Sequence, residues 1–147
     1  MAIKKRLARF AVISCTHCPF ENTDVIEKLL TRLSDGGPYG KITDFYHAGD
    51  LLESACASVH PNEADHTLQD EYESASSLLD NIRGVLPKDA NLHWLLGNHD
   101  DNLQVNDNRR TDWQTREMLH WNRSEWAKSF LKWRQYPYRR PSVHDQR

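Results

Sequence analysis

The sequence predicts an α/β fold in which three strands alternate with two helices, in the order β-α-β-α-β. Three observations predict it: short apolar runs rich in β-branched and aromatic residues, longer segments with apolar residues at helical spacing, and breaks that contain glycine or proline. This alternation is typical of parallel strands joined by right-handed crossovers. The length of 147 residues suits a single domain with its own core.

The first strand is expected at residues 7–14, LARFAVIS, between a basic lead-in and a polar cluster. A helix should follow over residues 24–37, because its apolar residues recur three and four positions apart. Asn22 or Thr23 can cap this helix, and a Gly-Gly-Pro sequence ends it. Arg9 interrupts the apolar start and no cleavage site follows, so we do not interpret the start as a signal peptide.

The second strand is expected at residues 42–48, ITDFYHA, and the third at residues 91–96, NLHWLL. Between them, a long helix is expected from about residue 65 to residue 83, with its end near Gly84 and Pro87. These five elements complete the predicted alternation.

Each predicted strand runs directly into a polar cluster. The clusters are Cys15-Thr16-His17, His47-Ala48-Gly49-Asp50 and Gly97-Asn98-His99-Asp100. In open α/β sheets, ligands bind outside the carboxyl ends of the strands. We therefore expect the three clusters to form one site.

The character of the chain changes after Asp107, where several tryptophans lie in a segment with a helical pattern. Trp126, Phe130 and Trp133 form an i, i+4, i+7 stripe, which is typical of a helix side that faces the core. Base stacking on these rings is the alternative. The last residues, RQYPYRRPSVHDQR, are expected to form a loop or an extended tail.

The charge is distributed unevenly, although the net charge is only −2. Residues 42–82 contain nine Asp or Glu and no Lys or Arg, whereas residues 109–147 contain ten Lys or Arg and four Asp or Glu. A basic stretch of this kind can bind nucleic acid, but the simpler interpretation is that it offsets the acidic stretch within one fold. No apolar run is long enough for a membrane span, and three cysteines do not suit a secreted disulfide framework, so a cytoplasmic location is expected.

Cys15 and Cys18 have the spacing of a redox C-x-x-C motif, which makes a thioredoxin-like thiol oxidoreductase one hypothesis. The helix that should follow such a motif does not begin at once, and the spacing explains neither HAGD nor LLGNHD. A structural zinc knuckle is a second hypothesis, but Cys56, His60 and His66 offer no matching pair of ligands.

A third interpretation takes His17 as the central residue. The chain has Cys15-Thr16-His17 after the first predicted strand, Gly49-Asp50 after the second, and Gly97-Asn98-His99-Asp100 after the third. In order, strand context and spacing, these motifs resemble those of the calcineurin-like metallophosphoesterase family, over about residues 8–102. That family has Asp-x-His, Gly-Asp and Gly-Asn-His-Asp or Gly-Asn-His-Glu in these places.

The resemblance implies a two-sheet sandwich flanked by helices, of which residues 1–108 would form the N-terminal half. Residues 109–147 would be a basic, tryptophan-rich helical segment and tail of the same domain. The resemblance also implies divalent metal ions, Mn, Zn or Fe, with two ions in the complete family site.

By the same resemblance, Asp50 would bridge the metals, while His17 would bind the first and Asn98 the second. His99 would protonate the leaving oxygen or stabilise charge on the phosphoryl group. Asp100 would orient His99 without binding metal. The substrate would be a phosphate ester.

The sequence departs from the family pattern in two ways. Cys15 stands where the family has Asp, and a thiolate suits zinc or iron better than manganese. Cys15 would therefore bias the metal, weaken the first metal site or leave one metal only, or it would be a lost or replaced ligand. The later Gly-His-x-His motif is missing, because His120 and His144 lie in no such context. We therefore expect a truncated domain with one sheet face to be covered, either by the tryptophan-rich tail or by another chain.

The expected function is metal-dependent hydrolysis of a phosphomonoester or phosphodiester by a two-metal mechanism, impaired where ligands are missing. The alternative is a catalytically silent remnant that binds a protein or nucleic-acid partner through its basic, aromatic tail, which contains Arg139 and Arg140. The thiol oxidoreductase is the third hypothesis. An exposed apolar sheet face would favour an oligomer or a complementing chain.

Overall fold

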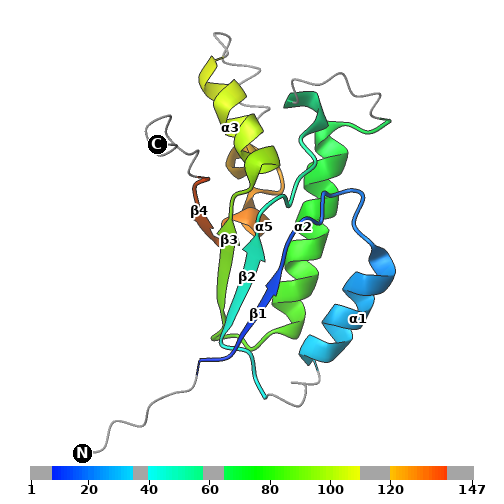
Figure 1. Cartoon of the computed structure of the whole chain (residues 1–147), viewed down its shortest axis with the longest axis vertical. Coiled ribbons are helices and arrows are strands. Elements are labelled where there is room, and N and C mark those ends of the chain that lie inside the picture. Colours follow the sequence, from blue (N-terminus) through cyan, green and yellow to red (C-terminus); the bar gives the residue numbers. More distant parts are fainter. Residues whose placement is uncertain (1–7, 35–39, 58–64, 110–119, 139–147) are drawn as a thin grey trace, which may run out of the picture.

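The structure is a computed structural model that describes residues 8–34, 40–57, 65–109 and 120–138. Basic residues Arg139 and Arg140, the Gly-Gly-Pro sequence and His60 lie outside these ranges. Figure 1 shows the elements in chain order, coloured from blue to red. They are β1 (Phe10–Ile13), α1 (Thr23–Ser34), β2 (Asp44–Ala48), η1 (Ala55–Ala57), α2 (Leu68–Val85), β3 (Asn91–Leu95), α3 (Asn98–Arg109), η2 (Trp121–Arg123), α5 (Ala127–Phe130) and β4 (Arg134–Tyr136).

The sheet has four strands in the order β1-β2-β3-β4, and every neighbouring pair is parallel. Phe10 pairs with Asp44, and Asp44 pairs with Asn91, so the first three strands start in step. The predicted α/β fold and its β-α-β-α-β order are therefore confirmed. Because the strands are parallel, their carboxyl ends all lie at one edge, near the start of α3 (Figure 1).

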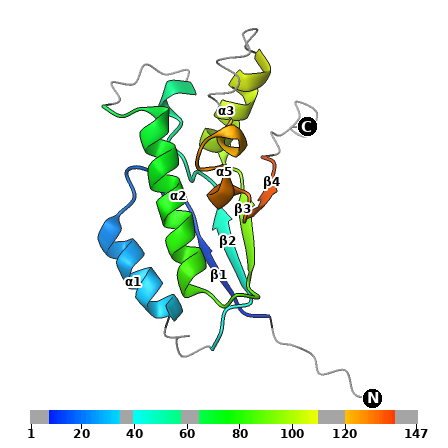
Figure 2. The same cartoon turned by 180° about the vertical axis from the view of Figure 1, so that it is seen from behind.

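One face of the sheet is covered by helices. Figure 2 shows α2 and α5 lying across the strands, with α1 beside α2. Alternate strand residues point to this side and are buried, among them Phe45, Leu92 and Trp94. This period-two alternation is the one expected of strands with a single covered face.

The long helix α2 begins at a capping box. The side chain of Thr67 accepts a hydrogen bond from the backbone N–H of Asp70, and the Asp70 carboxylate accepts one from the backbone N–H of Thr67. Such reciprocal caps satisfy two amides that the first helical turn leaves without partners. Helix α1 starts in a similar way, because the Asn22 side chain accepts from the N–H of Val25.

The tryptophan-rich segment packs on the same face as α2. Phe130 and Trp133 are almost completely buried. The Phe130 ring lies 5.9 Å from that of Tyr72 on α2 and 5.8 Å from that of Trp94 on β3, measured between centroids. The aromatic stripe therefore faces the core. Trp126 is the N-cap of the short helix α5, Phe130 is its last residue, and Trp133 lies in the turn after it. The next three residues add a strand, β4, where we expect a loop or extended tail.

The other face of the sheet is open among the described residues. Phe10 is 67% exposed and Val12 is 53% exposed, and both point to this side. On the same face, His93 stacks on Tyr46 and its Nδ1 lies 3.0 Å from the hydroxyl of Tyr136. Because the described part of the tryptophan-rich segment lies on the opposite face, a complementing chain stays a prediction. Within the described ranges, no helix has both the length and the apolar character that a membrane crossing demands.

Candidate functional site

The loops after β1 and β2 are joined by backbone hydrogen bonds. The N–H of Cys15 donates to the carbonyl of Gly49 at 2.9 Å, and that of His17 donates to the carbonyl of Asp50 at 3.0 Å. Cys18 continues the series with its bond to Leu51 at 2.8 Å. These bonds extend the β1–β2 pairing beyond the strands, and they bring the first two predicted clusters together.

Four residues of these loops have left-handed backbone conformations. Their φ values are 53° for Cys15, 48° for His17, 53° for Asp50 and 56° for Ser54. Residues other than glycine adopt this conformation rarely, and such strain is concentrated at functional sites. Three of the positions that sequence analysis selects as ligands, Cys15, His17 and Asp50, are thus held in unusual backbone geometry.

Glycine is required where the loops after β2 and β3 meet. A Cβ atom on Gly97 would overlap the carboxylate and the backbone nitrogen of Asp50. Gly49 has a φ of 98° and faces the Cα of Gly97. This close approach allows the Asp50 carboxylate to accept a hydrogen bond from the backbone N–H of His99 at 3.0 Å.

Cys15, His17 and Asp50 form a group whose ligand atoms all lie within 4.8 Å of one another. Thiolate, imidazole and carboxylate are the three ligand types of protein zinc sites. The donor set therefore fits a divalent ion of the zinc or iron type, and a thiolate makes it a poorer match to manganese or magnesium. Three of the predicted metal-site residues are close enough to share one ion.

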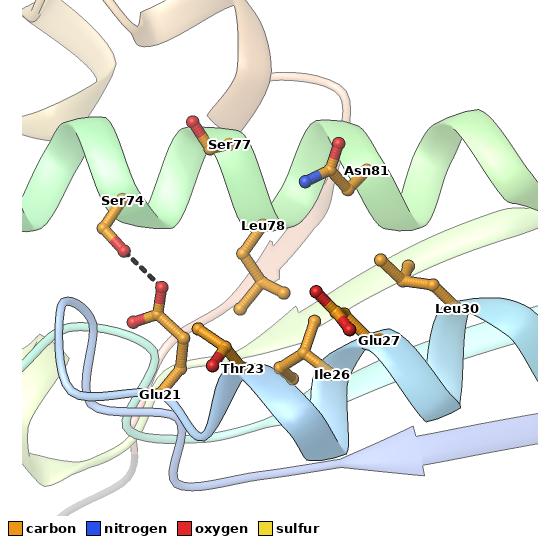
Figure 3. A pocket seen from close by; sticks show the side chains of 9 residues that line it. All are labelled: Glu21, Thr23, Ile26, Glu27, Leu30, Ser74, Ser77, Leu78 and Asn81. Carbon is orange, nitrogen blue, oxygen red and sulfur yellow. Dashed lines mark hydrogen bonds between the residues drawn. The ribbon is translucent and has the colours of Figure 1, made fainter.

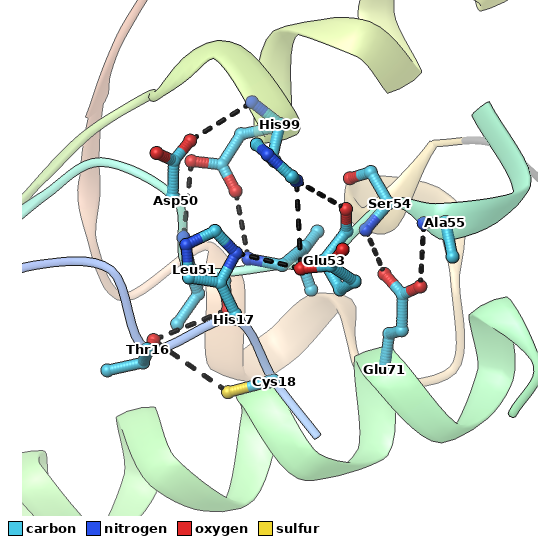
Figure 4. A network of polar contacts seen from close by, with 12 residues as sticks. Thr16, His17, Cys18, Asp50, Leu51, Glu53, Ser54, Ala55, Glu71 and His99 are labelled. Atoms are coloured by element: carbon cyan, nitrogen blue, oxygen red, sulfur yellow. Dashed lines mark hydrogen bonds and ion pairs between the residues drawn. The ribbon is translucent and has the colours of Figure 1, made fainter. Parts of the chain in front are cut away.

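Glu53 is a residue that the sequence analysis missed, and it lies between the two histidines of the site (Figure 4). Its Oε2 is 2.8 Å from Nδ1 of His17 and 3.7 Å from Nδ1 of His99. Nδ1 of His99 also donates to the backbone carbonyl of Glu53 at 2.7 Å. The two imidazole rings meet edge to face, with centroids 4.8 Å apart.

These contacts define which nitrogen of each imidazole is free. Because a carbonyl oxygen only accepts, the hydrogen-bond network assigns a proton to Nδ1 of His99 and leaves Nε2 as its second functional atom. By the same reasoning, Nδ1 of His17 donates to the Glu53 carboxylate, and its Nε2 keeps a lone pair. Metal-binding histidines commonly donate their other N–H to a carboxylate in this way.

Asp100 is completely buried, and its carboxylate joins the two loops. It accepts hydrogen bonds from the backbone N–H groups of Gly97 at 2.8 Å, Leu52 at 3.0 Å and Leu51 at 3.4 Å. Burial raises the pKa of Asp100 to about 6, although the three donors favour its charged form. The bonds found for this carboxylate thus go to backbone amides, and its predicted role in orienting His99 stays a prediction.

The remaining predicted ligand, Asn98, is the first residue of α3 and is exposed. It adjoins His99 at the carboxyl end of β3, so the third predicted cluster reaches the same edge of the sheet as the other two. The role of Asn98 as a ligand stays a prediction.

A second buried carboxylate supports the loop that carries Glu53. Glu71 on α2 accepts from the backbone N–H of Ser54 at 2.7 Å and from that of Ala55 at 3.1 Å. Nε2 of His66 lies 3.0 Å from Oε1 of Glu71, the oxygen that also accepts from Ala55. Burial raises the pKa of Glu71. The neighbourhood of Glu53 is therefore anchored to the longest helix of the fold.

The thiol chemistry of a redox motif finds no support at Cys18. This side chain is completely buried, and burial raises the pKa of its thiol to about 12. A thiol that stays protonated at neutral pH is a poor nucleophile. Cys15 is exposed, and neither residue forms a disulfide. The buried thiol of Cys18 therefore gives the redox hypothesis no support.

A separate cavity of about 220 Å³ lies between α1 and α2 (Figure 3). Ile26 and Leu78 line its apolar part, and at one end Ser74 donates a hydrogen bond to Glu21 at 2.6 Å. None of the predicted catalytic or metal-binding residues lines this cavity. The candidate site is therefore the polar cluster at the strand ends.

The buried side chain of His47 predicts how the free energy of unfolding should change with pH. It is buried on β2, and burial lowers its pKa to about 4, from an ordinary value of 6.5. Between these values the unfolded chain binds more protons, so the free energy of unfolding should fall with falling pH, by roughly 3 kcal/mol in total. The raised pKa of Asp100 acts in the opposite direction, because there the folded state binds more protons.

The contribution of His47 is isolated by comparing the wild type with His47→Gln, whose amide can still bond to the Thr16 hydroxyl that lies 3.0 Å from Nε2 of His47. Urea unfolding from pH 7 to pH 4 should show the wild type losing more stability than the variant. Parallel pH profiles for the two proteins would rule out this role of His47.

The family model for calcineurin-like phosphoesterases matches residues 8–141 of the chain. The match therefore extends from before β1 to beyond β4 and includes all three polar clusters. Comparisons with curated proteins and with solved structures gave no match.

Proposed function

The chain belongs to the calcineurin-like phosphoesterase family, and from this premise we propose that it hydrolyses phosphomonoester or phosphodiester bonds with the help of a bound divalent cation. The observation that carries the proposal is the group of Cys15, His17 and Asp50, whose ligand atoms lie within 4.8 Å of one another beside His99. It combines a cation site and a proton-transfer group at one edge of the sheet.

In this proposal Cys15, His17 and Asp50 hold the cation, and Asn98 adds an amide oxygen. When bound, a divalent cation supplies Lewis-acid polarisation of the phosphoryl oxygens. The Cys15 thiolate selects zinc or iron, because soft sulfur matches these ions better than manganese. A second cation, as in the complete family site, would need ligands in addition to these four residues.

His99 is the proposed proton donor to the leaving oxygen. Its Nδ1–H is held by the carbonyl of Glu53 at 2.7 Å, so Nε2 is the atom left to face a substrate. Oε2 of Glu53 also lies 3.7 Å from this Nδ1, so two oxygen atoms of Glu53 lie beside the same nitrogen. His99 is also partly exposed, as a group that meets a substrate must be.

The test is hydrolysis of a chromogenic phosphodiester and phosphomonoester by metal-free protein, with zinc or manganese then added back. Activity should appear only with metal. His99→Ala should lower kcat by about 10²–10⁴-fold, which is the usual contribution of a positioned acid. His93→Asn, on the open face of the sheet, is the matched control and should retain the wild-type rate.

Cys15→Asp restores the carboxylate that the family has at this position. We expect it to shift the metal preference of hydrolysis from zinc towards manganese. If neither the wild type nor this variant hydrolyses either substrate with any of the metals, the proposal is wrong. The silent, partner-binding remnant would then be the better interpretation.

A further inference from the structure

A second group of possible ligands lies beside the first. His17, Glu53 and His99 have ligand atoms that all lie within 4.8 Å of one another. We propose that these three residues form a cation site of their own, which takes a zinc-type divalent ion and competes with the first group for His17. The family motifs contain neither Glu53 nor a metal-binding role for His99, so this site goes beyond the proposed function.

The distances around Glu53 suit such an ion. In a tetrahedral zinc site with nitrogen and oxygen ligands, neighbouring ligand atoms lie about 3.3–3.6 Å apart. Oε2 of Glu53 is 2.8 Å from Nδ1 of His17 and 3.7 Å from Nδ1 of His99, which bracket this spacing. Two imidazoles and one carboxylate leave the fourth position for water, which is the usual form of an open zinc site.

The group is also accessible and well supported. The side chains of His17, Glu53 and His99 are 30%, 20% and 32% exposed, so an ion can reach them from solvent. The backbone next to Glu53 is held by the bonds from Ser54 and Ala55 to Glu71. A site with anchored ligands loses less conformational entropy when an ion binds.

The two cation sites cannot be occupied at the same time, because each needs a different tautomer of His17. An ion bound at Nδ1 of His17 places the imidazole proton on Nε2, because a neutral imidazole carries only one proton. Nε2 then has no lone pair for the group of Cys15 and Asp50. Through the same change of tautomer, His99 loses the Nδ1–H bond to the Glu53 carbonyl and is held as a ligand. The second site therefore removes one ligand and one proton donor from the first.

The experiment uses cobalt(II) as a spectroscopic probe of the whole chain. A thiolate ligand adds a near-ultraviolet charge-transfer band to bound cobalt, so the first group is visible through Cys15 and the second is not. The double variant Cys15→Ser/Asp50→Asn removes two ligands of the first group and leaves the second complete. It should still bind about one equivalent of cobalt, without the thiolate band.

Adding His99→Ala to this double variant should weaken the remaining cobalt binding by about tenfold or more, in the range found when support of a metal site is lost. Adding Glu53→Gln should do the same. Glu73→Gln, an exposed charge-matched control on α2, should leave the titration unchanged. Circular dichroism shows which variants fold, and Cys15→Ser alone replaces the double variant if that one does not.

No cobalt binding by a folded Cys15→Ser/Asp50→Asn variant would overturn the proposal, and so would binding that His99→Ala leaves unchanged. The competition has a separate readout that rests on the proposed function: zinc beyond the amount that fills the first group should lower zinc-supported hydrolysis by the wild type. Hydrolysis that zinc does not lower contradicts the competition. A complete lack of hydrolysis contradicts the proposed function, while the cobalt titration still decides whether the second site exists.

Discussion

Asp50→Asn is expected to lower phosphoesterase turnover by about a thousandfold, because it removes the only formal carboxylate charge from the group of Cys15, His17 and Asp50. The substitution is nearly isosteric. Asparagine tolerates the left-handed backbone at this position, where φ is 53°. Its amide oxygen can still accept the hydrogen bond from the N–H of His99. The loss of activity should therefore come from the charge and not from the fold.

Metal content by mass spectrometry and turnover of the chromogenic substrates measure this effect together. Asp44→Asn is the matched control, since it is the same change at the first residue of β2, the strand that precedes Asp50. The control should keep both metal and activity. If Asp50→Asn retains turnover within a few-fold of the wild type, Asp50 does not bind the cation used in hydrolysis.

Gly97→Ala is expected to destabilise the fold by about 3 kcal/mol or more and to abolish metal binding. Its Cβ would overlap the backbone nitrogen and the carboxylate of Asp50. Neither of these atoms belongs to the flexible end of a long side chain, so the loops after β2 and β3 would have to separate. Chemical unfolding, with metal binding measured alongside, tests both effects.

Gly84 offers a matched control for this substitution. It lies in the last turn of α2, where an added Cβ would meet no atom within 4 Å. Gly84→Ala should therefore raise stability by up to about 1 kcal/mol, through the better helix propensity of alanine. A Gly97→Ala variant as stable as the wild type would contradict the close contact with Asp50.

The elements with strong local patterns could be predicted from the sequence. The three strands, the two long helices and their order follow from apolar spacing, and their boundaries differ from the structure by a few residues. The expected first strand, residues 7–14, is twice as long as β1, which is limited to Phe10–Ile13. The convergence of three clusters followed from one fact, that parallel strands end at the same edge.

The elements without such patterns could not be predicted. Helix α3 carries few apolar residues, so its sequence shows no helical repeat of apolar positions. Its main local signal is the acidic first turn, with Asp100 and Asp101. Strand β4 has three residues and exists through its pairing with β3, as in the contact of Leu95 with Tyr136. Its stabilisation is tertiary, and a short window of sequence does not contain it.

The sequence pointed to some site residues and not to others for a similar reason. Cys15, His17 and Asp50 stand at strand ends, so topology alone brings them together. Glu53 lies three residues after Asp50, in a loop whose path depends on bonds to Glu71 and Asp100. In the sequence, Glu53 is a single carboxylate after two leucines. Whether it reaches the site depends on where the loop turns.

The buried carboxylate of Asp100 has a consequence for how the site can respond to a cation. This carboxylate accepts three hydrogen bonds from backbone N–H groups of two loops, so it couples the segment after β2 to the segment after β3. The two segments cannot move apart independently, because opening either one would leave the buried Asp100 carboxylate without hydrogen-bond donors. The site behaves as a preformed, stiff receptor. Its selectivity among ions would then depend on how well each ion fits the fixed positions of the ligand atoms, with little rearrangement on binding.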